Sequence, residues 1–217
     1  MRNLPLKIDL HVHTCYSGDT VTTLEEVVTY AKRRGLDGIA VTDHDTVAGA
    51  LELLKNYDLL VIPGIEIETS CGHIIGLNVA QTIPQGLGAA ETIERIHESG
   101  GLAVVAHPFA AFKSGWKSRV LSSLKVDAIE VKNSSNFPFL LTTYLSGRLA
   151  ARLNLPQTAG SDAHIPQAIG AAYTLIEAYS DATPEETVQA IKRGAVTPCG
   201  GAMSWALRYK NLFRKKR

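Results

Sequence analysis

The sequence predicts an α/β fold in a single domain, with a largely parallel sheet that is either open or closed into a barrel. Short β-like apolar runs alternate with longer helical stretches, which is the pattern of such sheets. A length of 217 residues suits one domain with a substantial core. Hydrophobic residues make up 45 % of the chain and charged residues 20 %, as in ordinary globular proteins. We find no apolar run approaching the roughly 20 residues of a membrane helix and no secretory leader.

The expected strands are short runs rich in β-branched and other apolar residues. They are Lys7–His11, Gly38–Thr42, Leu59–Ile62 with Ile65–Ile67, Ile74–Val79, Leu102–Ala106, Ala128–Val131, Gln157–Gly160 and Thr174–Ile176. The helices between them have readable ends. Thr22 and Thr23 precede two glutamates at capping-box spacing, and Gly35 ends that helix. Thr183 followed by Pro184 starts a later helix, which ends at Gly194.

Charge and cysteine content limit the class of protein. Six of the 22 Lys and Arg residues lie in residues 208–217, so the rest of the chain has about five more acidic than basic residues. An acidic body is compatible with bound cations and argues against a broad nucleic-acid footprint. The chain has only three cysteines, an uneven number that does not suit a disulfide framework. We therefore expect a reducing, cytoplasmic location.

Polar residues stand at the ends of several predicted strands, where parallel α/β folds bind ligands. His11 and His13 lie two apart on a strand, so their side chains project to one face and can share a metal ion. Asp162 and His164 have the same spacing. Imidazole with carboxylate suits Mn, Fe or Zn. His97 lies in a helical pattern instead, and we interpret it as a surface or packing residue. The motifs HxH, TDH, GIE, AHP and SDAH, in this order, predict a metal centre.

This ordered set resembles the PHP (polymerase and histidinol phosphatase) family, and the resemblance covers residues 7–176. It implies a distorted (β/α)7 TIM-like barrel with two or three divalent ions (Mn, Zn or Fe). By position, it implies that His11, His13, Glu66 and Asp162 surround one ion. Glu66 would bridge to a second ion, which His73 and His107 also hold. A third would bind Asp19, His44 and His164, although Asp19 is also compatible with a simple turn before the helix. We expect residues 1–204 to form the barrel and 205–217 a basic C-terminal helix or tail.

Residues that support the ligands are a further expectation. We place Asp9 and Asp43 next to ligand histidines, as partners for their second N–H group. Glu130 ends a strand where the family often has a glutamate, and we expect it to orient a ligand or substrate. Cys71, two residues before His73, is either a soft ligand or a small buried side chain, and we favour the latter.

The resemblance implies phosphoester hydrolysis by attack of a metal-bridging hydroxide, with Glu66, His107, Asp162 and His164 as catalytic residues. No GxSxG or Walker-type motif indicates a covalent route or nucleotide loop. A small phosphomonoester is the leading substrate class. A nuclease or phosphodiesterase acting on single strands and a non-catalytic metal-stabilised partner module are the alternatives.

Substrate and partner contacts remain open in the sequence. The loop after His107 lacks an early arginine, so Lys113, Lys117 or Arg119 would have to hold phosphate, unless the loop is simply solvated. The short segment between His73 and His107 predicts an open site. The basic C-terminus either packs on the barrel as an amphipathic helix or contacts nucleic acid or an anionic membrane. The oligomeric state is not indicated.

Overall fold

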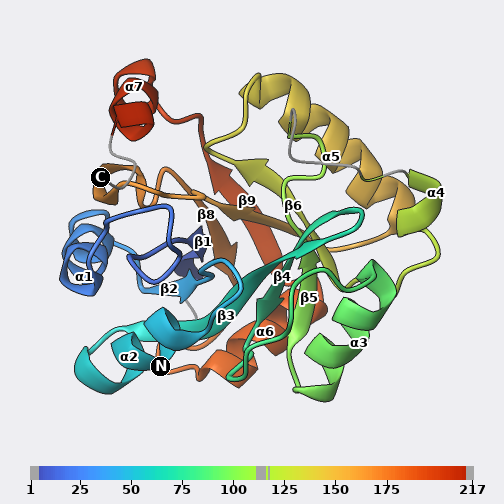
Figure 1. Ribbon diagram of the computed structural model, residues 1–217, viewed down its shortest axis with the longest axis horizontal. Coiled ribbons are helices and arrows are strands. Elements are labelled where there is room, and N and C mark those ends of the chain that lie inside the picture. The colour runs from blue at the N-terminus through green and yellow to red at the C-terminus, as the bar shows by residue number, and fades with distance from the viewer. Residues whose placement is uncertain (1–4, 111–115, 117, 214–217) are drawn as a thin grey trace.

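Strands and helices alternate along the chain in the computed structural model, which describes residues 5–110, 116 and 118–213 (Figure 1). The strands are β1 (Leu6–Val12), β2 (Gly38–Val41), β3 (Leu60–Thr69), β4 (Gly72–Leu77), β5 (Leu102–Val105), β6 (Ala128–Asn133), β7 (Gln157–Gly160), β8 (Ala172–Ile176) and β9 (Val196–Gly200). The helices are α1 (Leu24–Arg33), α2 (Ala48–Asn56), α3 (Ala89–Glu98), α4 (Ser118–Leu121), α5 (Phe139–Leu153), α6 (Pro184–Lys192) and α7 (Trp205–Phe213), with a 3₁₀ turn at Pro166–Ala168.

The strands form one sheet in the order β7-β6-β5-β4-β3-β2-β1-β8-β9. The sheet curls so that the residues after β7 return to β1. The backbone N–H of Asp162 donates to the carbonyl of His11 at 2.8 Å, and the N–H of His13 donates to that of Ala163 at 3.2 Å. These bonds nearly close the sheet into a barrel, which confirms the α/β barrel class. They also bring the HxH and SDAH motifs side by side.

Strand directions differ from the largely parallel sheet that the sequence predicts. Among the described residues, four of the eight strand pairs are parallel and four are antiparallel. The β3–β4 pair is a hairpin because only Ser70 and Cys71 separate the two strands, which is too short a link for a parallel crossover. β8 runs antiparallel to β1 and carries β9 outside it.

Helix ends follow the sequence signals. Thr23 caps α1 and Thr183 caps α6, each in a reciprocal capping box with the glutamate three residues later. Three clusters of buried apolar residues fill the space between helices and sheet. The aliphatic positions of β1, β2 and β3 belong to these clusters, so the strands that carry the polar motifs are held on a rigid core.

Two elements near the C-terminus need separate comment. β9 is absent from the predicted strands because its sequence, Val-Thr-Pro-Cys-Gly, carries a proline, which sheets accept mainly in edge strands, and a glycine, which weakens a strand. α7 follows it and lies at the upper left of the molecule in Figure 1. In the part of the chain that the structure describes, no helix has the length and apolar character needed to cross a membrane.

Candidate metal centre

The nine residues predicted as ligands lie together, although they come from six parts of the chain. His11 lies near the end of β1 and His13 follows that strand. His44 and His107 follow β2 and β5, and the β3–β4 hairpin carries Glu66 and His73. The turn after β1 supplies Asp19, and the segment after β7 supplies Asp162 and His164. Side-chain N and O atoms of eight of them form three groups, each with its atoms within 4.8 Å of one another; the third group consists of His44, Glu66 and His73. His107 belongs to none of these groups and joins the cluster through Glu66, whose Oε1 lies 3.0 Å from its Nε2. The groups share members, so the cluster is continuous.

Glu66 lies at the centre of this cluster and is almost fully buried. Its Oε1 atom is 2.8 Å from Nδ1 of His73 and 3.0 Å from Nε2 of His107. Its Oε2 atom is 3.2 Å from Nε2 of both His11 and His13. Oε2 also lies 3.4 Å from Nδ1 of His44. One carboxylate therefore faces two different sets of imidazoles, as a ligand shared between neighbouring ions would.

The group formed by His11, His13, Glu66 and Asp162 is buried on every side. Nε2 of His11 lies 3.1 Å from Nε2 of His13, and Oδ1 of Asp162 lies 3.6 Å and 3.3 Å from these two nitrogens. Nδ1 of His11 faces a carboxylate oxygen of Glu130 at 2.9 Å, so this nitrogen carries the hydrogen. If the His11 ring is neutral, its Nε2 atom carries a lone pair, which faces Nε2 of His13 and the carboxylate oxygens of Glu66 and Asp162. The donor set thus fits a divalent cation of the Mn, Fe or Zn type.

The group formed by His13, Asp19, His44 and His164 lies nearer the solvent. Oδ2 of Asp19 is 2.8 Å from Nε2 of His164 and 3.5 Å from Nε2 of His44. The side chain of Asp19 is 40 % exposed and that of His44 is 26 % exposed. The structure thus brings Asp19 into the cluster, beyond the turn role that its sequence position also allows. This side of the cluster faces the solvent.

Electrostatics within the cluster favour charged groups. Burial raises the pKa of Glu66, but the neighbouring His11, His107 and His13 outweigh it and hold that pKa well below its ordinary value. Burial lowers the pKa of His11, but the carboxylates of Glu130, Glu66 and Asp162 outweigh it and raise that pKa well above its ordinary value. The buried carboxylates therefore favour a positive charge at His11, and metal ions bound at the same atoms would supply positive charge in its place.

Side chains outside the cluster hold the ligands in place. Glu130 accepts from His11 Nδ1 and, through its other oxygen, from the backbone N–H of His107 at 2.9 Å. Asn133 Nδ2 donates to Oε2 of Glu130 at 3.0 Å and to Oδ2 of Asp162 at 3.2 Å. The Ser17 hydroxyl lies 2.9 Å from Nδ1 of His13. Sequence reasoning missed Asn133 and Ser17, since neither residue type in a strand or turn signals a metal site.

Asp9 and Asp43 do not play the part predicted for them. Asp9 accepts backbone N–H groups of His11, Ser161 and Gly170 and contacts no imidazole in the described hydrogen bonds. Asp43 accepts the N–H and the hydroxyl of Thr14. Both carboxylates lie where backbone donors, not imidazoles, are nearest. They fix the backbone that carries the histidines. Burial raises the pKa of Asp9 to about 6, despite these hydrogen bonds.

Backbone strain is concentrated at the site. His107 has φ +27°, Asp162 has φ +52° and Asp45, next to His44, has φ +54°. Residues other than glycine rarely adopt positive φ, and such strain persists where the surroundings impose it. Among the described residues, Nδ1 of His107 is also buried without a hydrogen-bond partner. Both features mark a site shaped by function.

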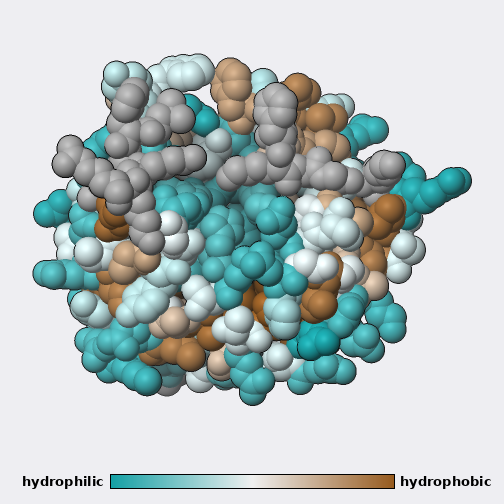
Figure 2. Space-filling view, in the orientation of Figure 1, coloured by the Kyte–Doolittle hydropathy of each residue, from teal (hydrophilic) through white to brown (hydrophobic). Residues whose placement is uncertain are grey.

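The remaining predicted residues lie elsewhere. Arg119 is exposed on α4, and Lys113 and Lys117 fall outside the described residues. Cys71 is partly buried against the apolar core and belongs to none of the metal-ligating groups of the described residues. His97 pairs with Asp127 at 2.7 Å, away from the cluster, which agrees with its interpretation as a surface or packing residue. Figure 2 shows hydrophilic residues over the middle of the face, in front of the barrel strands of Figure 1.

Comparison with known proteins identifies relatives of this arrangement. A family model described as PHP-associated matches residues 144–196. An uncharacterised protein of Methanocaldococcus jannaschii is 39 % identical over 142 residues, covering 59 % of this chain and 82 % of its own. A phosphoribosyl 1,2-cyclic phosphate 1,2-diphosphodiesterase of Eggerthella lenta is 39 % identical over 100 residues, covering 41 % and 37 %.

A solved structure has the same fold. It is a two-domain protein of Bacteroides vulgatus described as containing a predicted PHP-like metal-dependent phosphoesterase. Its TM-score is 0.75 at 18 % identity, and the match covers 93 % of this chain and 67 % of that protein. With the motif order, the barrel and the clustered histidines and carboxylates already in place, these matches assign the family. The chain belongs to the PHP family of metal-dependent phosphoesterases, which hydrolyse phosphoric esters.

Proposed function

We propose that the chain hydrolyses a small phosphomonoester at two or three divalent ions, Mn, Zn or Fe, in the reducing environment of the cytoplasm. The observation that carries the proposal is the position of Glu66 between two sets of imidazoles. His11, His13, Glu66 and Asp162 would hold one ion, Glu66, His73 and His107 a second, and Asp19, His44 and His164 a third. When bound, such ions activate water at neutral pH and neutralise the charge on phosphate oxygens.

Other residues of the chain would orient the ligands and determine from which side the substrate reaches them. Glu130, Asn133 and Ser17 fix the orientation of His11, Asp162 and His13 through the hydrogen bonds described above. The buried group around His11 excludes water, whereas Asp19 and His44 line the exposed side. A substrate therefore enters from that side. The leaving oxygen would depart on the same side, where water is available to protonate it.

A phosphodiesterase or nuclease is the second candidate. One relative carries a diphosphodiesterase name, and the exposed side of the cluster is compatible with a longer substrate. Cleavage of short single-stranded oligonucleotides with release of mononucleotides would favour this candidate, especially if reversing the charges of residues 214–217 weakened binding. A non-catalytic module is the third candidate, and less than one metal ion per chain would favour it.

Hydrolysis of an aryl phosphate with Mn²⁺ tests the leading proposal. His107→Ala removes one imidazole that faces Glu66, and we expect at least a hundredfold loss of kcat, as for a ligand of a catalytic ion. His97→Ala is the matched control, because His97 lies outside the cluster. Equal activity of the two variants would contradict the proposed site. Hydrolysis of bis-aryl phosphate alone would shift the assignment to the diester.

A further inference from the structure

Arg208, on α7, binds backbone carbonyl groups of the loop that follows β6. Its Nη1 atom donates to the carbonyl of Ser135 at 2.8 Å, and its Nη2 atom donates to those of Ser134 at 3.0 Å and Asn136 at 2.7 Å. Its Nε atom donates to the carbonyl of Met203 at 3.2 Å. One planar guanidinium thus gathers three successive carbonyls, which only an arginine offers enough fixed donors to do.

The same loop holds the segment that carries Asp162. The Ser134 hydroxyl donates to the carbonyl of Ser161 at 2.7 Å, and the Ser135 hydroxyl donates to that of Asp162 at 2.9 Å. Asn133, at the start of the loop, donates to the carboxylate of Asp162 and is itself bonded through Oδ1 to the N–H of Ser135 at 3.0 Å. Both the backbone and the side chain of Asp162 are therefore bound to residues 133–135.

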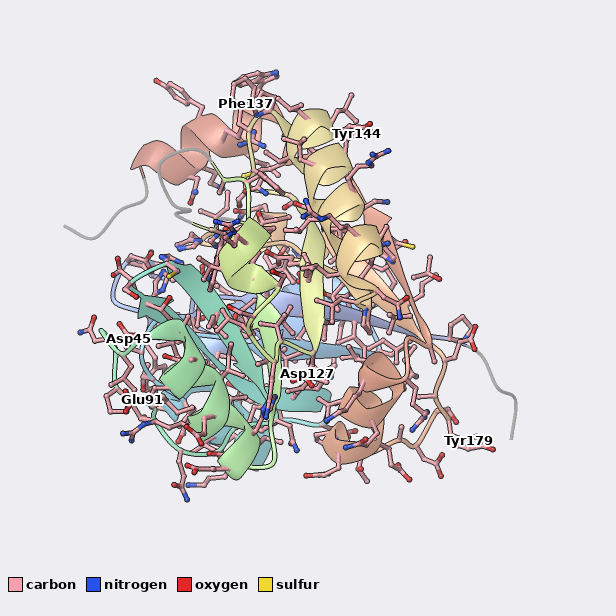
Figure 3. All side chains as sticks on the ribbon, turned by 90° about the vertical axis from the view of Figure 1, so that its right-hand side faces the viewer. Asp45, Glu91, Asp127, Phe137, Tyr144 and Tyr179 are labelled. Atoms are coloured by element: carbon pink, nitrogen blue, oxygen red, sulfur yellow. The ribbon has the colours of Figure 1, made fainter. Side chains whose placement is uncertain are left out.

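This support holds a backbone with φ +52° at Asp162, a conformation that residues other than glycine adopt infrequently, although aspartate does so more readily than most. While the side chains of Ser134 and Ser135 bind the segment that carries Asp162, Arg208 binds the backbone carbonyl groups of residues 134–136. Phe137, at the end of the loop, packs edge-on against Trp205 of α7 with ring centroids 5.3 Å apart. Figure 3 shows Phe137 between α7 and the start of α5. The loop is thus held between α7 and the metal centre.

We propose that Arg208 is a positioning residue of the metal centre, acting through the loop 134–136 to hold Asp162 in its ligating orientation. α7 is then part of the active site and not a detached basic tail. The match to the PHP-associated family model covers residues 144–196, so it includes Asp162 but neither the loop 134–136 nor Arg208. The inference rests on the proposed function, since Asp162 matters in this way only if the cluster binds metal.

Four variants test the inference. Arg208→Ala removes the guanidinium and Arg208→Lys keeps the charge with a single donor group. Ser135→Ala removes the hydroxyl that reaches Asp162, without touching α7. Lys210→Ala is the matched control, because Lys210 is an exposed cation of the same helix. For each, the Mn²⁺ affinity is measured by calorimetric titration, kcat and KM are measured separately with an aryl phosphate, and thermal unfolding is followed in chelator.

We expect Arg208→Ala and Ser135→Ala to lower Mn²⁺ affinity or kcat by about 10- to 100-fold, the usual effect of residues that orient metal ligands. The KM of both variants should change little. The Mn²⁺ affinity and kcat of Arg208→Lys should lie between those of Arg208→Ala and the parent, and those of Lys210→Ala should match the parent. A fifth variant that combines Arg208→Ala with Ser135→Ala should lose less than the product of the two single losses, because both residues act on one loop. Millimolar guanidinium should restore part of the activity of Arg208→Ala and none of that of Ser135→Ala.

Several outcomes would overturn the inference. One is parental metal affinity and kcat in Arg208→Ala, and another is independent, multiplicative losses in the double variant. If Arg208→Ala unfolds at the assay temperature, Ser135→Ala and Arg208→Lys decide, and parental behaviour of both rejects the role. Failure of the proposed function is distinct, because the parent protein itself would then bind no Mn²⁺ and hydrolyse no aryl phosphate.

Discussion

Nδ1 of His11 lies 2.9 Å from Oε1 of Glu130, a contact in which both side chains are buried. Because the carboxylate can only accept, this contact fixes the ring so that Nε2 of His11 faces Glu66 and His13. The interaction joins β6 to the C-terminal end of β1. It explains why a glutamate that lies behind the proposed ligands belongs to the site.

Glu130→Gln keeps the shape of this side chain and removes its charge. We expect Mn²⁺ affinity or kcat to fall by about 10- to 100-fold, because His11 loses the partner that orients and polarises it. Mn²⁺ titration and steady-state kinetics measure the two quantities. Glu94→Gln, on the exposed face of α3, is the control. Indistinguishable behaviour of the two variants would mean that Glu130 does not act through His11.

Asp19→Ala should remove one metal ion and leave the others. Asp19 bridges His44 and His164 at the solvent side, whereas the buried group around Glu66 does not include it. Elemental analysis after dialysis should therefore show about one ion fewer per chain than in the parent. Asp181→Ala, at an exposed position, is the control and should keep the metal content of the parent. An unchanged metal content in Asp19→Ala would return Asp19 to the role of a turn residue.

Removal of metal should destabilise the fold. Ions bound at about 100 times their dissociation constant contribute about 2.7 kcal/mol to the free energy of unfolding. In a domain of this size that corresponds to a fall in Tm of about 5–10 °C on adding chelator. Excess Mn²⁺ should restore the Tm, and Mg²⁺, a poor partner for imidazole, should restore less. A Tm that chelator leaves unchanged would argue against resident ions.

Gly160→Ala tests how closely β7 approaches β1. A Cβ atom at Gly160 would collide with Cβ of His11 and lie 2.8 Å from the His11 nitrogen and 2.9 Å from Oε1 of Glu130. We expect a loss of more than about 2 kcal/mol in unfolding free energy, together with weaker Mn²⁺ binding. Gly147→Ala, in α5, meets no atom within 4 Å and should be neutral or stabilising by up to about 1 kcal/mol. Denaturant titrations of both variants and the parent measure these differences in the free energy of unfolding.

The clustered residues were predictable because their signals are local. Spacing of two on a strand gave His11 and His13 a common face, and apolar runs located the strand ends that carry His44 and His107. The nearly closed barrel then follows from the resemblance and is confirmed by the contacts between His11, His13 and the segment after β7.

Other features depend on tertiary contacts that no short sequence pattern encodes. Asn133 and Ser17 are common polar residues whose partners lie 29 and four positions away. The carboxylates of Asp9 and Asp43 bind backbone N–H groups, and residue type alone cannot distinguish this from binding an imidazole. No residue of the antiparallel strands β4 and β8 is fully exposed, so neither shows the apolar–polar alternation of a strand with one face in solvent, and the alternation of strand and helix misstated their direction.

Anomalous diffraction from a crystal soaked in Mn²⁺ is the most direct test of the central claim that Glu66 is shared between metal ions. We expect anomalous peaks on both sides of its carboxylate. One should lie among His11, His13 and Asp162, and the other beside His73 and His107. A map without peaks at this carboxylate, or with a single peak remote from it, would contradict the assignment of the metal centre.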